Sequence, residues 1–339
     1  MCFGGHHQDQ RGAKSQTTAK ARRARRERDG GKTLAMDCLL RVSFAFFAPS
    51  RLCLCFLMLA GTIAGCTPTR PTTQPSGGYF GPTESMPQVI ARINANNKRI
   101  PTLWALIGSF DVWARNPGTD KTDYINGSGG YLFYRGPDEF RLRGNKDLAG
   151  LILDVGMNGE QYWLAALSPG PDVMWWGTVG HAVAASADLP IRPELLSEVL
   201  GISIFDDDFL AEPYPVMRFN TDRDAYMFLF CRADGDRVIA QKEVWYDRAT
   251  LKAILVILFD SDGRPILRAH LTNHQKISGG GDLPAVAMGY DLLFPQTRSR
   301  LVLRLEKAEI QHKGVPGDAS FRFPGVDIVK TAKNIDAKD

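Results

Sequence analysis

The spacing of hydrophobic residues changes near residue 100, which divides the predicted fold into one helix followed by many strands. Within residues 86–100 the apolar positions recur at helical spacing, with Ser85 placed as an N-cap and Pro87 in the first turn. From Leu103 onward apolar and polar residues alternate instead, which is the period of a β-strand. The pattern therefore predicts an amphipathic helix that leads into a sheet.

Segments with strand-like alternation recur through the rest of the chain and are separated by turn signals such as Asn158-Gly159. They are residues 103–112, 130–135, 139–143, 151–155, 161–167, 173–178, 226–232, 238–247, 254–259, 266–274, 286–294 and 301–310. Residues 193–200 look helical, because Pro193 suits a first turn and Gly201 can end the helix. The sequence predicts about eleven strands and two or three helices.

Several predicted strands are apolar on both faces, notably residues 226–230 and 254–259. An antiparallel sheet with one solvated face alternates apolar and polar residues, so both faces of these strands must be covered or must line a dry cavity. We therefore predict an α+β fold: a strongly curved antiparallel sheet that forms an incomplete β-barrel, lidded by helices, in one domain over residues 84–330.

The N-terminal part of the sequence has the features of a targeting segment. Residues 1–35 are basic and polar and lack the periodicity of a core, so we interpret them as a disordered leader or mis-started sequence rather than a nucleic-acid-binding arm. Met36 is an alternative start, since Arg41 and Arg51 then precede an apolar stretch at residues 52–64. Residues 36–65 are predicted to be a secretory signal peptide, because the stretch is shorter than the ~20 residues that span a membrane.

Cys66 directly follows the predicted signal peptide, which is cut before it. Its context, Ile63-Ala64-Gly65-Cys66, resembles the lipobox of bacterial lipoproteins. The resemblance implies that lipid is attached to the thiol of Cys66, and that this lipid is the protein's contact with the membrane. Thr67 follows the cysteine, which by resemblance to enterobacterial sorting favours the outer membrane, facing the periplasm. Residues 66–83 are rich in Pro, Thr and Gly and are predicted to be a flexible tether, and residues 331–339 a disordered tail.

The net charge of the chain without its N-terminal leader bears on which partners are expected. The whole chain has 41 Lys and Arg against 37 Asp and Glu, a net charge of +4. Eleven of those basic residues and four of the acidic ones lie in residues 1–51, which leaves 30 against 33 in the remainder. The folded part is thus slightly acidic, and we expect no nucleic-acid partner.

Candidate catalytic and metal-binding motifs are weak throughout the sequence. His270 and His274 would lie about 13 Å apart on an extended strand, too far for one ion. The acidic run at residues 206–208 lacks calcium-loop spacing, and the glycines at residues 279–281 lack the Lys-Ser or Lys-Thr of a phosphate loop. Cys231 lies in an apolar run and is expected to be a buried, inert thiol. We expect no catalytic residue, no metal and no cofactor, and a protein that is not an enzyme.

Aromatic and Met side chains are the remaining candidates for a binding site. Most are expected to pack in the core, but a two-faced apolar sheet also allows some to line a pocket for acyl chains. The candidate lining residues are Trp104, Phe110, Phe133, Trp163, Trp175, Trp176, Phe228, Phe230, Trp245 and Met288. Trp175 and Trp176 are adjacent, so on a strand they face opposite sides and one of them is expected to point at the cavity or its lid.

The order of elements resembles the LolA/LolB-like superfamily of bacterial lipoprotein carriers and receptors. The resemblance rests on the helix at residues 86–100, the strand at residues 107–112, the segment at residues 130–142, which has the pattern G-x-L-x-(Y/F)-x-x-P-x-x-(F/L)-R, and the closing Phe321-x-Phe-Pro-Gly. It implies an incomplete barrel whose apolar cavity accepts the acyl chains of lipoproteins or lipids, with a periplasmic carrier as partner. The alternative is a structural envelope lipoprotein of the same fold with a filled core.

Overall fold

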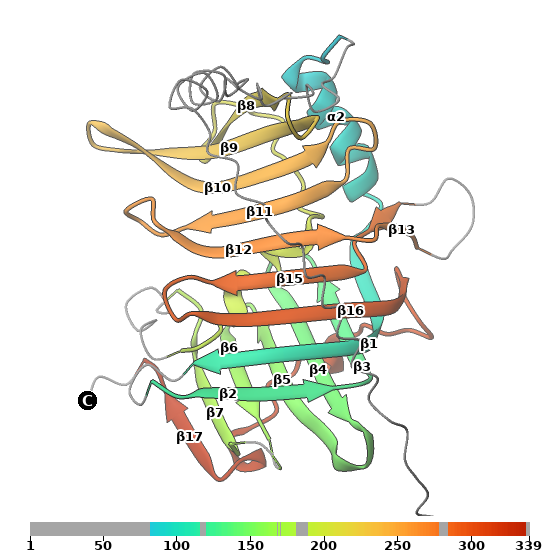
Figure 1. The fold of residues 1–339 in the computed structure, drawn as a ribbon, viewed down its shortest axis with the longest axis vertical. Coiled ribbons are helices and arrows are strands. Elements are labelled where there is room, and N and C mark those ends of the chain that lie inside the picture. Colours follow the sequence, from blue (N-terminus) through green and yellow to red (C-terminus); the bar gives the residue numbers. More distant parts are fainter. Residues whose placement is uncertain are drawn as a thin grey trace, which may run out of the picture. The chain divides into compact units, whose positions relative to one another are not determined.

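The computed structural model describes residues 82–115, 120–167, 169, 171–180, 189–277 and 284–336. This part of the chain is mostly β-structure, built on one large, curved, mixed sheet that does not close on itself (Figure 1). Among the described residues there is one α-helix, α2 (Met86–Asn97), and five short 3₁₀ helices. The fold class expected from the sequence is confirmed at this level: a large curved sheet with few helices.

Helix α2 begins where its sequence predicts and ends at Asn97, three residues before the predicted end at residue 100. Ser85 precedes it in an extended conformation, and the side chain of Gln88 accepts a hydrogen bond from the Ser85 N–H at 3.0 Å. Its buried face carries Val89, Ile90 and Ile93, which join the main core. Two asparagines, Asn94 and Asn97, are buried on the same face. Helix α2 therefore presents both apolar and polar groups to the sheet.

Fifteen strands form the main sheet. The first half of the chain supplies β1 (Thr102–Arg115), β2 (Thr122–Gly127), β3 (Gly130–Arg135), β4 (Glu139–Lys146), β5 (Gly150–Asn158), β6 (Gln161–Ala166) and β7 (Val173–Thr178). The second half supplies β8 (Tyr214–Asn220), β9 (Ala225–Asp234), β10 (Arg237–Asp247), β11 (Ala253–Phe259), β12 (Pro265–Thr272), β15 (Gly289–Phe294), β16 (Ser299–Glu309) and β17 (Thr331–Asn334). Strands β13 (Gln275–Lys276) and β14 (Ala285–Val286) pair separately.

The two halves of the sheet join at β1 and β16. The strand order is β17-β7-β6-β5-β4-β3-β1-β16-β15-β12-β11-β10-β9-β8, with β2 paired to β1 (Figure 1). All neighbours are antiparallel except β17, which lies parallel to β7. Strands β8 and β17 end the order without pairing to each other, so the sheet is open.

A bulge in β1 changes which face its side chains occupy. The register with β16 shifts between Leu106 and Ile107 and again before Ser109. As a result Trp104 lies in a small outer cluster, whereas Phe110 lies in the main core, although both positions are even-numbered. Gly108 lies at this bulge, where a Cβ would lie only 2.7 Å from the side chain of Glu306.

Three sequence expectations about elements need correction. The helix predicted at residues 193–200 is two separate 3₁₀ helices, η2 (Pro193–Leu195) and η3 (Glu198–Leu200). The tail predicted to be disordered from residue 331 begins with β17, where Asp172 Oδ1 accepts the Lys330 N–H at 3.2 Å and Asp336 Oδ2 accepts the Thr178 N–H at 2.6 Å. The sheet also has more than eleven strands, because the sequences of β2, β8 and β17 do not alternate between apolar and polar residues.

The C-terminal part of the chain packs on the outer face of the sheet. There 3₁₀ helix η4 (Asp318–Phe321) follows β16, and η5 (Val326–Ile328) precedes β17. Buried Arg141 makes a bidentate pair with Asp154 at 2.6 and 2.9 Å and also donates to the Arg322 carbonyl at 3.0 Å. Asp154 further accepts the Trp163 indole N–H at 3.0 Å. This satisfied network holds the C-terminal segment against β4, β5 and β6.

The segment at residues 189–213, between β7 and β8, covers the inner face of the sheet. Its side chains Leu196, Val199 and Leu200 meet apolar residues of β3, β4, β15 and β16, where a residual void of about 10 Å³ remains. Gly201 follows in the left-handed region with φ 75°, and a Cβ there would lie 2.6 Å from Leu271 and 2.9 Å from Ala253. The middle of the inner face is thus filled, and the segment beyond Gly201 runs toward β9.

Candidate functional site

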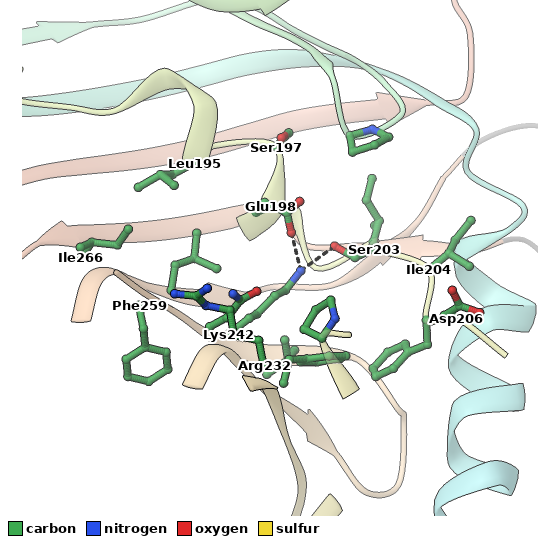
Figure 2. Close-up of a pocket in the computed structure, with 18 of the residues that line it drawn as sticks. Leu195, Ser197, Glu198, Ser203, Ile204, Asp206, Arg232, Lys242, Phe259 and Ile266 are labelled. Carbon is green, nitrogen blue, oxygen red and sulfur yellow. Dashed lines mark hydrogen bonds and ion pairs between the residues drawn. The ribbon is translucent and has the colours of Figure 1, made fainter. Parts of the chain in front are cut away.

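A cavity of about 910 Å³ lies between residues 192–213 and the inner faces of β9, β10 and β11. The β3–β4 turn and the residues just after α2 complete its wall. Figure 2 shows side chains from the covering segment and from the strands gathered around it. Much of the lining is apolar, including Leu195, Ile202, Ile204, Phe205, Phe230, Val244, Leu258, Phe259 and Ile266. The volume lies within the range of small-molecule binding sites.

One end of the cavity is closed by packed aromatic rings. The ring of Phe205 lies 4.9 Å from that of Phe228, 5.2 Å from Phe230 and 5.9 Å from Tyr246, centroid to centroid. Phe228 and Tyr246 are almost wholly buried. These contacts have the edge-to-face and tilted geometry that aromatic pairs prefer. The aromatic rings at this end are therefore packed against one another.

Two buried asparagines of α2 hold the covering segment in place. Asn94 donates to the Phe205 carbonyl and accepts from the Phe205 N–H, each at 2.9 Å. Asn97 donates to the Ser203 carbonyl at 2.8 Å. These bonds satisfy backbone groups that have no strand partner. The helix therefore fixes residues 203–205, and with them one wall of the cavity.

A polar cluster interrupts the apolar lining where β10 faces η3. Lys242 Nζ lies 2.6 Å from Glu198 Oε2 and 3.0 Å from Ser203 Oγ, as Figure 2 shows. The Lys242 side chain is 16% exposed and that of Glu198 is 40% exposed. The lysine end of the pair is therefore mostly shielded from solvent. Hydrogen bonds to a charged group are stronger there than at the surface.

Tyr134 and Ser197 are buried residues of the lining that carry a hydroxyl group. Burial, reinforced by the negative charges of Glu198 and Asp138, raises the pKa of Tyr134 from its ordinary value of 10 to about 12. Ser197 is 5% exposed, and its Oγ has no hydrogen-bond partner among the described residues. A buried hydroxyl without a partner is costly, and a bound group that accepts a hydrogen bond would remove that cost.

The aromatic residues proposed from the sequence as cavity lining are dispersed in the structure. Phe230 lines the cavity, and Phe228 packs behind it at the aromatic end. The other eight do not line it. Trp104 and Phe133 form an outer cluster with Phe321. Phe110 and Met288 belong to the main core.

The remaining four tryptophans also lie away from the cavity. Trp163 is fully buried, and both Trp163 and Trp176 contact the ring of Phe323 in the C-terminal segment. Trp175 packs against the main core and has Lys333 over its ring at 5.9 Å. Trp245, on β10, donates its indole N–H to Glu243. Trp175 and Trp176 do face opposite sides, but the ring of Trp176 meets the C-terminal segment.

Sequence reasoning did not identify the residues that shape the cavity. Glu198 and Phe205 come from the covering segment and Lys242 from β10, and the three form no motif. One signal was present: Asn94 and Asn97 occupy the same helical face as Ile90 and Ile93. Two polar residues on an otherwise apolar helix face indicate buried hydrogen-bonding partners.

The histidine and cysteine candidates lie apart from the cavity. His270 and His274 are not cavity-lining residues, and burial lowers the pKa of each. Burial raises the pKa of the Cys231 thiol, as expected for an inert side chain. Within the described ranges no group of three or more His, Cys, Asp or Glu could hold a metal ion.

The predicted anchor lies outside the described residues. Cys66, the signal peptide and nearly all of the tether belong to residues 1–81, which the structure does not describe. In the part of the chain that is described, no helix has the length and apolar character needed to cross a bilayer.

Comparisons with known proteins give matches of structure alone. No family model and no curated protein matches the sequence. The structure is similar to a putative outer membrane lipoprotein-sorting protein domain from Vibrio parahaemolyticus, at 11% identity and a TM-score of 0.39, covering 69% of this chain and 95% of the other. A LolA superfamily protein from Nitrosomonas europaea matches at 11% identity and 0.39, covering 70% and 96%.

A third match is a DUF1329 family protein from Desulfovibrio piger, at 10% identity and a TM-score of 0.45, covering 71% of this chain and 97% of the other. These matches include the LolA superfamily that the sequence resemblance named. At such identities and TM-scores, the function proposed below rests on the geometry of the cavity itself.

Proposed function

We propose that this chain is a cell-envelope protein that binds lipid, with the acyl chain held in the cavity between residues 192–213 and strands β9 to β11. The observation that carries this proposal is a cavity of about 910 Å³ with extensive apolar lining and a closed aromatic end. Non-enzymatic binding, in lipid or lipoprotein transport, is the activity that this lining supports best.

The free energy available from the lining is sufficient for binding. Each methylene group that moves from water into an apolar site contributes about 0.8 kcal/mol. Ten such groups would contribute roughly 8 kcal/mol, from which the costs of immobilising the ligand must be subtracted. The balance corresponds to useful affinity for an amphiphile of moderate chain length.

The experiment is to purify the full chain, identify co-purified lipid by mass spectrometry, and titrate it with a fluorescent fatty acid. Leu195→Trp should abolish or strongly weaken binding, because Leu195 lines the cavity and is partly exposed, so a larger side chain fills the space. Leu148→Trp is the matched control, since Leu148 is fully exposed on η1 (Asp147–Ala149). Equal binding by both variants, or none by the parent chain, would contradict the proposal.

The lipid anchor at Cys66 is the second part of the proposal. Two or three acyl chains hold a protein stably on a bilayer, whereas one gives marginal binding. Cys66→Ala should therefore move the protein from the membrane fraction to the supernatant after osmotic lysis. Retention of the variant on the membrane would refute the anchor and leave the cavity proposal untouched. Fractionation of inner and outer membranes then tests the outer-membrane assignment.

The alternative function is that of a scaffolding lipoprotein whose core needs no ligand. That hypothesis predicts no bound lipid and no effect of Leu195→Trp on interactions with other envelope components. The size of the cavity favours ligand binding over this alternative.

A further inference from the structure

The carboxylates that line the cavity already have hydrogen-bond donors within the protein. Four carboxylates line it, and each already accepts a hydrogen bond within the protein. Glu198 accepts from Lys242. Glu212 accepts the Ala233 N–H, Asp206 the Asp208 N–H, and Asp260 the N–H groups of Asp262 and Arg264.

Several donor groups of the same cavity have no acceptor among the described residues. Arg232 lines the cavity, is partly buried, and has no hydrogen-bond or ion-pair partner among the described residues. Lys242 has three N–H groups and uses two of them, on Glu198 and Ser203. Ser197 adds a buried hydroxyl without a partner. Unused donors around a cavity indicate a ligand that supplies acceptors.

The strand register orders these groups along the cavity. Lys242 of β10 lies opposite Phe230 of β9 and Leu258 of β11. Two residues further along β10, Val244 lies opposite Phe228 and Val256, which are wholly buried. In the other direction, toward the β9–β10 hairpin, Arg232 shares the face of Phe230 two residues along the strand. The lining therefore changes from apolar to cationic along β9 and β10.

From these observations we infer that the cavity selects amphiphiles with an anionic head group, bound by Arg232 and Lys242 while the chain extends toward Phe205 and Phe228. This inference rests on the proposed lipid-binding function and adds the class of ligand to it. A carboxylate or a phosphate head fits equally, since both accept several hydrogen bonds and carry negative charge. Figure 2 shows Arg232 and Lys242 on the same side of the cavity.

Arg232→Gln tests the inference cleanly, because the Arg232 side chain has no hydrogen-bond or ion-pair partner among the described residues. The full chain in a non-ionic detergent is titrated with ¹³C-carboxyl laurate, with dodecyl phosphate and with dodecanol, using protein-free micelles as reference. Arg232→Gln should weaken laurate and dodecyl phosphate by about tenfold and leave dodecanol unchanged. Arg237→Gln removes the same charge at an 81% exposed site outside the cavity and should change nothing.

Bound laurate also gives a spectroscopic signature. The ¹³C chemical shift of its carboxyl group should report a lower pKa than in protein-free micelles, because cationic neighbours favour the charged form. Arg232→Gln should move that pKa back toward the value in micelles. A second variant, Lys242→Met with Glu198→Gln, removes both charges of the ion pair together, so that neither is left buried alone. It should weaken laurate and spare dodecanol.

Three outcomes would overturn the inference. If dodecanol binds as tightly as laurate and Arg232→Gln changes neither, the head group is not recognised, although the proposed lipid-binding function would stand. If neither amphiphile binds, the proposed function fails together with the inference. If acetate or inorganic phosphate alone binds in an Arg232-dependent manner, the site is one for small anions and not for amphiphiles.

Discussion

Two parts of the inner face of this sheet are covered by the same segment of chain, but one is filled and the other is hollow. Before Gly201, Leu196, Val199 and Leu200 occupy the space over β3, β4, β15 and β16 and leave about 10 Å³. Other residues of the same segment, including Leu195 and Glu198 before Gly201 and residues 202–206 and 211–213 after it, line a cavity of about 910 Å³ over β9 to β11. The covering segment is thus a core element over one half of the sheet and a wall over the other.

The difference separates the residues that stabilise the protein from those that are available for binding. The filled half is lined by aliphatic side chains together with Phe140 and Tyr290, as expected of a close-packed interior. The hollow half contains the Lys242–Glu198 pair and the unpartnered Arg232. Polar groups that would be costly in a packed core are thus placed beside space that a ligand can occupy.

Adjacent leucines provide the strongest test of this comparison. Leu196→Ala, in the filled half, should lower the free energy of unfolding by about 2–5 kcal/mol, because it removes buried methyl groups and leaves a cavity. Leu195→Ala, one residue away but facing the hollow half, should cost less than about 1.5 kcal/mol, since its side chain is already partly exposed. Urea denaturation measures both, and equal losses would show that the two halves do not differ.

Asn94 links α2 to the wall of the hollow half. Asn94→Ala removes both hydrogen bonds to the Phe205 backbone and leaves two buried polar groups without a partner, which should cost about 1–3 kcal/mol. Because Phe205 closes the aromatic end, affinity for a fluorescent fatty acid should fall as well. Loss of stability with unchanged affinity would show that residues 203–205 do not shape the site.

Ionisation of buried tyrosines is expected to change the free energy of unfolding least. Tyr134 reports on the hollow half and Tyr290 on the filled half. The pKa of Tyr134 in the hollow half is raised to about 12, so the folded state keeps a proton that the unfolded state releases near pH 10. Its contribution to stability is complete below pH 10 and is lost as the pH rises to about 12. Tyr134→Phe should reduce the loss of stability over this interval, measured by denaturation at each pH.

Bound lipid sharpens this last test. A ligand in the cavity removes remaining water from Tyr134 and should raise its pKa further, whereas Tyr290 in the filled half, whose pKa burial already raises, should not respond. The tyrosinate absorbance of Tyr134→Phe and Tyr290→Phe distinguishes the two residues. A shift that persists in Tyr134→Phe would place the ligand elsewhere.

Local sequence patterns identified most of the elements of this fold. The spacing of apolar residues predicted α2 and most of the long strands, because helix and strand periods are properties of short windows. Local patterns missed β2, β8 and β17, which pair with β1, β9 and β7. Residues 193–200 had a helical pattern but form two 3₁₀ turns, since packing against two halves of the sheet overrides local propensity.

The site was less predictable than the fold. Alternation predicted that Trp104 and Phe110 share a face, and the bulge at Gly108 separates them. Of the ten residues proposed as lining, Phe230 lines the cavity, since aromatic residues fill cores and outer clusters as readily as pockets. Lys242, Glu198 and Arg232 have no local signal, because the fold brings Glu198 of the covering segment to Lys242, 44 residues away along the chain.

The sequence by itself determined that strands apolar on both faces, such as those at residues 226–230 and 254–259, need cover on the inner side as well as the outer. It could not determine how completely that cover fills the space, because periodicity identifies residues that share a face and says nothing of the course of the segment opposite. The tertiary structure decided this within the covering segment, where Leu196, Val199 and Leu200 pack against one part of the sheet while Leu195 and Glu198 line a cavity over another part.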